Sequence, residues 1–361
     1  MDVVKCFAQT YAEARGLFLS AARDAGAVVE TIHHPLLGPA GEELATDVAL
    51  SGNPEAAKLL ITSSGTHGIE GFCGSGAQVG LLRSDFVESL GEDVALLQIH
   101  AQNPHGFAHE RRVTEDNVDL NRNFIDFDAP LPQNPGYDEL HDFLVPAAWD
   151  GPAREAADAG LQAFIAEKGL WAFQEALSFG QYSHPDGLYF GGRAPTWSRR
   201  TISGIVEHFG AGRSDVGVID FHSGLGPRGF GELIVTGGAH SDNYDRARAW
   251  YGEDAKSPEA GDSVSAVVSG SLDEGYLNGL PDARVTFIAI EYGTLAPVEV
   301  MEALQADNWL YVHGEVASEQ GRAIKQRIRA AFYGEEPKWK QDIWRRADEI
   351  ARKALAGLRG A

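Results

Sequence analysis

Four apolar runs, each followed at once by polar residues, are the feature that most constrains how this chain can fold. They cover residues 58–63, 94–101, 216–221 and 284–291. Their consecutive positions are apolar, as expected for strands that are buried on both faces of a sheet. Helix-like stretches occupy several of the intervals between them, for example near 74–83. This alternation predicts an α/β fold with a largely parallel or mixed sheet.

Composition removes several classes of function. The 361 residues include 52 acidic and 30 basic side chains, which gives a formal net charge of −22. A nucleic-acid backbone binder needs a basic face and a polybasic membrane-surface protein needs clustered cations, so neither partner is expected. The two cysteines, Cys6 and Cys73, exclude a disulfide scaffold and a cysteine-based zinc cluster.

No apolar stretch approaches the length of a membrane-spanning helix. The first residues also lack the basic start and apolar run of a signal peptide, so a cytoplasmic location is expected. The sequence does not indicate an oligomeric state.

The loop after the first apolar run carries His67 and Glu70, three residues apart and flanked by glycines. A tight turn that enters a helix can bring residues at this spacing to one point. Imidazole nitrogen and carboxylate oxygen are ligands that zinc accepts in catalytic sites. A glycine-rich turn capped by Thr66, with Glu70 in the first helical turn, explains the same residues without a metal.

His222 directly follows the run 216–221. As a third ligand from a distant strand, it completes a site of two histidines and one glutamate and leaves a fourth position open. Asp220 is then a candidate for the partner that fixes the imidazole tautomer. The alternative is a histidine whose hydrogen bonds are satisfied by Ser223 or Asp220 without any metal.

Two pairs of polar residues follow the second run. Arg111 and Arg112 lie shortly after it, where a cation could stabilise a developing oxyanion. Asn121 and Arg122 are adjacent, and a guanidinium fork matches a carboxylate while an amide adds a donor. Each arginine could instead form an ion pair with a neighbouring acidic residue; the candidates are Glu110, Glu115, Asp116 and Asp119.

Glu291 ends the run 284–291. A carboxylate at the end of an apolar strand is partly desolvated, which raises its pKa toward the range of a general base. The alternative is a charge that simply faces solvent at a strand terminus.

Six motifs stand in one order between residues 58 and 295. They are a His-x-x-Glu pair, an Asn-Pro-x-Gly turn, an arginine, the sequence Asp-Leu-Asn-Arg-Asn-Phe, a strand ending in His-Ser, and a strand ending in Glu. This order resembles the carboxypeptidase A-like zinc peptidases. Almost the whole chain, including 64–72 and 189–198, is similar to a bacterial branch of that superfamily described only as a domain of unknown function.

The resemblance implies one catalytic domain over residues 1–361, with an eight-stranded, mostly parallel mixed sheet flanked by helices. Residues 125–190 are then an insertion near the active site that restricts its entrance. The resemblance also implies that His67, Glu70 and His222 hold one Zn²⁺ per chain.

The resemblance assigns the remaining roles as follows. Arg112, or less favourably Arg111, polarises the scissile carbonyl. Asn121 and Arg122 bind the terminal carboxylate of the substrate. Glu291 activates water and passes its proton to the leaving amine.

Residues 269–276 are similar to the segment that shapes the substrate side-chain pocket in that superfamily. Leu272 lies near the pocket-lining position, which predicts an apolar or small side chain in the substrate. Digestive members carry a mobile tyrosine shortly before this segment. The chain has none there, and Tyr276 is only a weak substitute.

The sequence therefore predicts a zinc hydrolase that cleaves an amide bond next to a free carboxylate, acting on short peptides or N-acylated amino acids. An aspartoacylase-like deacylase of N-acyl amino acids is the second hypothesis. The third is a non-catalytic binding protein on the same scaffold.

Overall fold

The computed structural model describes residues 1–237 and 241–360. In this part of the chain one eight-stranded sheet runs in the order β1-β2-β4-β3-β5-β8-β6-β7. The strands are β1 (Val28–Leu37), β2 (Glu43–Ser51), β3 (Lys58–Ser64), β4 (Val94–His100), β5 (Asp215–Arg228), β6 (Gly231–Ile234), β7 (Ala255–Lys256) and β8 (Arg284–Gly293). The central strands β4, β3, β5 and β8 are parallel to one another. The pairs β1–β2, β2–β4 and β6–β8 are antiparallel, and β6 and β7 are parallel. The predicted α/β fold with a mixed sheet is confirmed.

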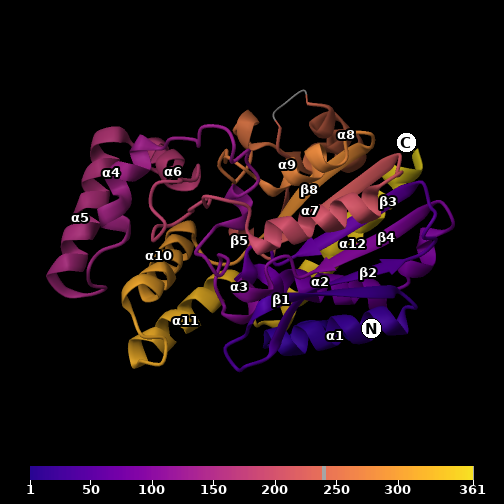
Figure 1. Cartoon of the computed structure of the whole chain (residues 1–361), viewed down its shortest axis with the longest axis horizontal. Coiled ribbons are helices and arrows are strands. Elements are labelled where there is room, and N and C mark those ends of the chain that lie inside the picture. The colour runs from indigo at the N-terminus through magenta and orange to yellow at the C-terminus, as the bar shows by residue number, and fades with distance from the viewer. Residues whose placement is uncertain (238–240, 361) are drawn as a thin grey trace.

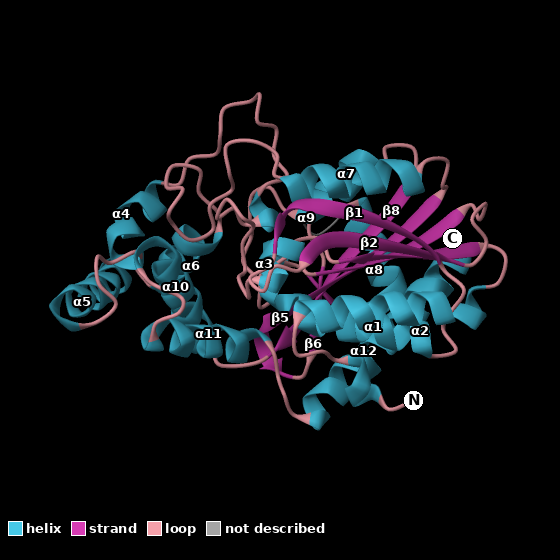
Figure 2. Cartoon of the chain, turned by 60° about the horizontal axis from the view of Figure 1, so that its bottom comes forward, coloured by secondary structure: helices cyan, strands magenta, loops and turns pink. Residues whose placement is uncertain are grey.

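Helices cover both faces of this sheet. In Figure 2, α7 and α9 lie above it, and α1, α2 and α12 lie below it. The helices are α1 (Tyr11–Asp24), α2 (Gly71–Arg83), α3 (Pro104–Ala108), α4 (Pro135–Leu144), α5 (Gly151–Lys168), α6 (Leu170–Ser178), α7 (Trp197–Gly210), α8 (Asp242–Tyr251), α9 (Leu272–Gly279), α10 (Pro297–His313), α11 (Glu319–Phe332) and α12 (Pro337–Gly360).

The central strands are buried on both faces because their apolar residues alternate between two cores. In β3, Leu59 and Ile61 pack toward α7 and α9, while Leu60 packs toward the helices of the opposite face. In β5, Val218 belongs to the first of these cores and Ile219 to the second. This two-sided burial is the physical reason for the continuous apolar runs in the sequence.

The connections from β3 create a topological switch point at the carboxyl ends of the parallel strands. β3 lies between β4 and β5. The next strand in the chain, β4, pairs with one edge of β3, and the later strand β5 pairs with its other edge. Ligands of open α/β sheets bind at such a switch point.

Two strands extend further than the sequence predicts. β5 continues to Arg228, so His222 lies within a strand rather than after it, and β8 continues to Gly293, two residues beyond Glu291. The two strands stay paired from Asp215 with Arg284 through Gly224 with Gly293. The polar residues that follow the apolar runs of β5 and β8 continue the strand pairing. A prediction based on apolar residues alone ends each strand too early.

Residues 125–190 contain three helices, α4, α5 and α6, where the sequence indicates two helical patches. In Figure 1 these helices lie with α10 and α11 at one end of the sheet. The short strands β6 and β7 and the helix α9 are further elements that the sequence analysis does not identify. Among the described residues, no helix has both the length and the apolar composition that crossing a membrane requires.

Candidate metal centre

His67, Glu70 and His222 meet at one point although 155 residues separate the two histidines. One potential ligand atom from each lies within 4.8 Å of the others. The Nδ1 atom of His67 is 2.9 Å from Oε1 of Glu70, and Nδ1 of His222 is 3.2 Å from Oε2 of Glu70. All three side chains are buried.

The loop after β3 positions the first two of these residues because two glycines let it pack without side chains. A Cβ on Gly68 would lie 2.1 Å from the backbone carbon of Gly106 in α3, and a Cβ on Gly71 would lie 2.6 Å from the ring of Phe107. The backbone N–H of Gly68 also donates to the carbonyl of Arg112. These contacts hold the 3-10 turn Gly68–Glu70, which directs Glu70 toward the strands.

Each histidine is held through Nε2, the ring nitrogen that faces away from Glu70, by Asp220 in the case of His222 and chiefly by Arg112 in the case of His67. The Nε2 atom of His222 lies 2.5 Å from Asp220, as predicted for an orienting partner. Asp220 in turn accepts hydrogen bonds from Ser63 and Thr66. The Nε2 atom of His67 accepts a hydrogen bond from NH2 of Arg112 at 2.8 Å and lies 3.3 Å from Asp119. Each ring is thus fixed with Nδ1 directed into the cluster.

Thr66 therefore has a different partner from the one expected of a helix cap. Its hydroxyl donates to Asp220 rather than accepting from a helical N–H. The turn that begins after His67 has no side-chain cap.

Charges within the cluster stabilise one another. Burial opposes ionisation of Glu70, but the adjacent His67 and His222 outweigh it and lower the pKa of Glu70 well below its ordinary value. Burial likewise opposes the charged form of His222, yet Asp220 and Glu70 raise the pKa of that imidazole well above its ordinary value. A metal ion that binds Nδ1 of His222 must displace this proton.

Glu291 lies beside the cluster on the neighbouring strand. In the sheet it is the register partner of His222. Its Oε1 atom accepts the backbone N–H of Leu225 at 2.9 Å. Burial, together with repulsion from Glu70, raises the pKa of Glu291 to about 8. A half-buried carboxyl of this kind can hold or release a proton near neutral pH.

The two adjacent arginines point in different directions. Arg112 contacts the cluster, because its NH1 atom donates to Glu70 at 3.2 Å and its Nε atom donates to Asp119 at 3.0 Å. Arg111 instead donates to Asp307 at 3.1 Å, outside the cluster. Of the two candidates for polarising a carbonyl, the structure brings only Arg112 to the site.

Arg122 is 3% exposed, and no carboxylate of the described residues lies within ion-pair distance of it, although the charge of Asp119 acts on it. Its Nε and NH2 atoms donate to the carbonyl of Ser178, and NH1 donates to the carbonyl of Asn121. Two of its five N–H groups, one on each terminal nitrogen, therefore have no partner in the described part of the chain. Burial lowers the pKa of Arg122, so a bound anion would offset an existing cost.

Asn121 has its side-chain oxygen fixed and its nitrogen available. The oxygen accepts the backbone N–H of Leu272 at 2.7 Å, which orients the amide. The two N–H groups on Nδ2 are not used in this contact. The prediction that Asn121 binds a carboxylate requires such donors.

Leu272 and Tyr276 are not brought to the cluster as side chains. Both are almost fully buried and belong to the core beneath α7 and α9. The hydroxyl of Tyr276 accepts a hydrogen bond from Gln102. The expectation that these two side chains contact substrate is therefore corrected. They lie on α9, a helix that the sequence analysis did not identify, and its apolar face packs against the sheet.

Sequence reasoning missed two residues of the site. Asp119 holds both Arg112 and His67, whereas the sequence suggested it only as an ion-pair partner. Its position two residues before Asn121 is a signal that could have identified it. Tyr189 places its ring 5.3 Å from the guanidinium carbon of Arg112 and equally far from that of Arg122. It has a positive φ of 53°, which sequence does not reveal.

Cys73 lies near the cluster but is a buried side chain. Burial raises the pKa of its thiol well above the ordinary value, which disfavours a nucleophilic thiolate.

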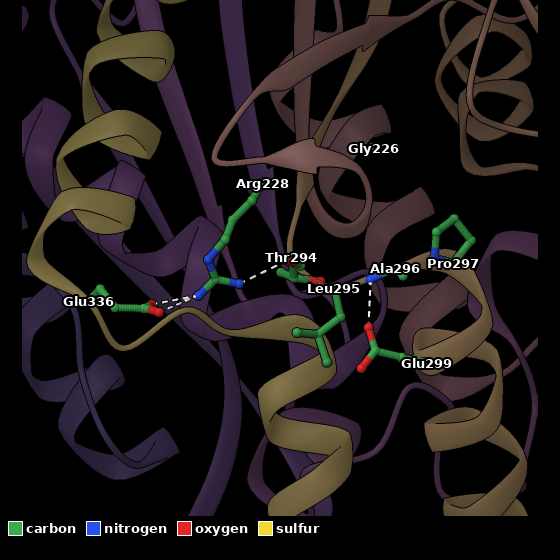
Figure 3. A pocket seen from close by; sticks show the side chains of 8 residues that line it. All are labelled: Gly226, Arg228, Thr294, Leu295, Ala296, Pro297, Glu299 and Glu336. Atoms are coloured by element: carbon green, nitrogen blue, oxygen red, sulfur yellow. Dashed lines mark hydrogen bonds and ion pairs between the residues drawn. The ribbon is translucent and has the colours of Figure 1, made fainter.

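A separate pocket of about 600 Å³ lies between the end of β5 and the start of α10 (Figure 3). Its charged groups are already paired, because Arg228 contacts Glu336 and Glu299 accepts the N–H of Ala296. None of the residues lining it belongs to the metal cluster, so this pocket is not the candidate site.

The donor set fits a divalent transition metal. Two imidazole nitrogens and one carboxylate are the ligands of catalytic zinc sites that keep a fourth position open. His222 already has the orienting carboxylate that such sites use, which is Asp220.

A family model described as "Protein of unknown function (DUF2817)" matches residues 7–346. The chain belongs to the DUF2817 family. The expectation that it lies in a family described only as of unknown function is confirmed. A comparison of this DUF2817 chain with curated proteins finds no match.

Several solved structures are similar to this DUF2817 chain. Carboxypeptidase A from Helicoverpa armigera is 13% identical with a TM-score of 0.45, over 90% of this chain and 74% of that one. A metallo-carboxypeptidase from Burkholderia cenocepacia is 12% identical with a TM-score of 0.38, over 88% and 67%. An aspartoacylase family protein from Mesorhizobium loti is 16% identical with a TM-score of 0.35, over 81% and 68%. Similarities this low do not assign an activity.

Proposed function

We propose that this DUF2817 chain is a zinc-dependent hydrolase that cleaves an amide bond adjacent to a free carboxylate. The observation that carries the proposal is the convergence of His67, Glu70 and His222 with Glu291 as the strand neighbour of His222. Three ligands with an open fourth position and an adjacent carboxyl of raised pKa form the arrangement that metal-assisted amide hydrolysis requires.

The residues divide the chemistry between them. Zinc, when bound by the three ligands, supplies Lewis acidity toward water and the scissile carbonyl. Glu291 takes a proton from the attacking water and delivers it to the leaving nitrogen. Arg112 donates to the oxygen on which negative charge develops, a contribution of about 3 kcal/mol for one well-placed donor.

Recognition of the carboxylate rests on Arg122 and Asn121. Arg122 is a buried cation that lacks a carboxylate partner among the described residues, and it keeps two free N–H donors. Asn121 is oriented by Leu272 so that its amide nitrogen can donate. Charge-assisted hydrogen bonds from such a pair favour a substrate with a free carboxylate.

A second candidate is the deacylation of N-acyl amino acids by the same residues. The predicted insertion forms a wall beside Arg122, and this wall suits deacylation and the cleavage of short peptides alike. The carbonyl of Ser178 accepts from that guanidinium, and the hydroxyl of Tyr182 donates to the backbone carbonyl of Arg122. A wall this close favours small substrates, whether short peptides or acylated amino acids.

Metal analysis and a substrate panel test the proposal. Elemental analysis of the purified protein should find zinc, and zinc content should fall in His67→Ala. Dipeptides and N-acyl amino acids should then be compared by kcat/KM, which separates the peptidase from the deacylase. Bound zinc without hydrolysis of any panel member would contradict the enzyme and support a binding protein. Absence of metal binding would contradict both.

A further inference from the structure

A second group of metal-ligand side chains lies within the segment 125–190. His141 of α4, together with His184 and Asp186 of the turn 183–187 after α6, each offer a ligand atom, and these atoms lie within 4.8 Å of one another. The two imidazole rings are stacked with centroids 3.8 Å apart. The Nε2 atom of His141 is 3.6 Å from Oδ1 of Asp186. None of these residues belongs to the cluster of His67, Glu70 and His222.

Buried amides hold the turn that carries two of these side chains. Gln181 is fully buried, and its side-chain oxygen accepts the backbone N–H of His184 while its nitrogen donates to the carbonyl of the same residue. Asn117 donates to the carbonyl of Gly187. Asn308 donates to the carbonyl of Asp186 at 2.8 Å. The backbone of the turn is thus fixed on both sides of His184 and Asp186, as a preorganised ligand site requires.

The side chains themselves are partly satisfied and partly open. His184 is oriented by Asp138, whose Oδ1 lies 2.9 Å from its Nε2 atom. The Nδ1 atom of His141 is buried and has no hydrogen-bond partner among the described residues. The other ring nitrogen, Nε2, is the one that faces Asp186, and this 3.6 Å contact leaves it open to an ion that Asp186 would share.

The charge around the pair also suits a cation. Asp138, Asp142 and Asp186 are the carboxylates whose charges act on His141.

We propose that His141, His184 and Asp186 form a second site for a divalent transition metal, with zinc as the ion that best suits two imidazoles and one carboxylate. The ion would join α4 to the turn 183–187. Tyr189, whose ring lies over Arg112 and Arg122, follows this turn. The second site would therefore stabilise the segment that borders the first. The proposal does not rest on the proposed hydrolase function.

Zinc stoichiometry of the full chain tests this site separately from the first. The wild type, dialysed against a weak chelator and reloaded with Zn²⁺, should bind two ions per chain. His67→Ala/His222→Ala should keep one ion, and His141→Ala/His184→Ala should also keep one. His208→Ala, an exposed histidine on α7, is the matched control and should keep two.

A thermal readout complements the count. In the His67→Ala/His222→Ala background, added Zn²⁺ should raise Tm, because an ion that binds only the folded chain stabilises it. Adding His184→Gln and Asp186→Asn to this background should abolish the rise in Tm on addition of Zn²⁺. These milder changes replace His141→Ala/His184→Ala if that variant does not fold. The proposal is overturned if His184→Gln/Asp186→Asn retains full zinc content, or if His67→Ala/His222→Ala binds none. One ion that is lost only in the His184 variants would support this site and refute the first.

Discussion

His222 and Glu291 are register partners on the parallel strands β5 and β8. Paired residues of neighbouring strands project to the same face of a sheet, so the strand pairing itself delivers a candidate ligand and a candidate base to one place. The Leu225 N–H further fixes the carboxyl of Glu291. The relation between metal cluster and base is therefore a property of the sheet and does not depend on a mobile loop.

Substitution Glu291→Gln should separate metal binding from turnover. Because Glu291 is not among the three ligands, zinc content should be unchanged. Loss of general acid–base catalysis should reduce kcat by about 10²–10⁴-fold. Steady-state kinetics with the best substrate of the panel provides the measurement. Glu302→Gln on the exposed side of α10 is the control, and wild-type turnover in Glu291→Gln would refute the assignment.

Substitution Asp220→Asn should weaken metal binding without removing a ligand. The carboxylate holds Nε2 of His222 and makes that imidazole a better donor, so its neutral replacement should lower zinc affinity about 10–100-fold. Competition with a chromogenic chelator measures this affinity. Asp215→Asn tests the same chemical change at the opposite end of β5. Equal affinities in the two variants would show that Asp220 has no influence on the ion.

Much of the site could be predicted because its residues follow apolar strands. The run 58–63 identifies β3 and places His67 just beyond it, and the run 216–221 does the same for His222 on β5. Strand ends of a parallel sheet share one edge, so local patterns already imply convergence. Side chains of these strands alternate between two cores, so consecutive residues are apolar, and the strands can therefore be recognised in a single sequence.

The remainder depends on contacts between distant segments. Sequence could not decide between Arg111 and Arg112, because the choice depends on Asp307 of α10, which pairs with Arg111. Leu272 and Tyr276 were misplaced because an eight-residue helix packs them into the core. Tyr189 belongs to the site because of its positive φ and the contacts of its ring with Arg112 and Arg122. Neither feature can be recognised from the residues next to it in the sequence.

The stability of the protein should fall in mild acid because His100 is buried in its neutral form. Burial lowers the pKa of His100 to about 4, while an unfolded histidine titrates near 6.5. Between these values the unfolded chain binds more protons, so stability is complete above pH 6.5 and decreases as pH falls toward 4. The loss should be roughly 2–3 kcal/mol.

His100→Gln provides the comparison for that titration. Glutamine can keep a hydrogen bond to Ser75, which lies 2.9 Å from Nε2 of the histidine, but it does not titrate. Denaturant unfolding between pH 7 and pH 4 should therefore show a smaller decrease for His100→Gln than for the wild type. Parallel pH dependences would show that His100 does not contribute to acid destabilisation.

Substitution Arg122→Gln should act on the substrate carboxylate and not on the chemistry. Removing a buried cation from a carboxylate site should raise KM about 10–100-fold while leaving kcat within a few-fold, because this contact is equally strong in ground and transition states. With the wild type, a substrate whose carboxylate is converted to an amide should show the same rise in KM. Wild type and Arg122→Gln should have similar KM values for this amide substrate. Arg122→Lys, which keeps the charge but loses the fork that holds the Ser178 carbonyl, should have an intermediate KM.

The control is Arg193→Gln, a substitution of an exposed arginine. An unchanged KM in Arg122→Gln, with native circular dichroism, would mean that another group binds the carboxylate.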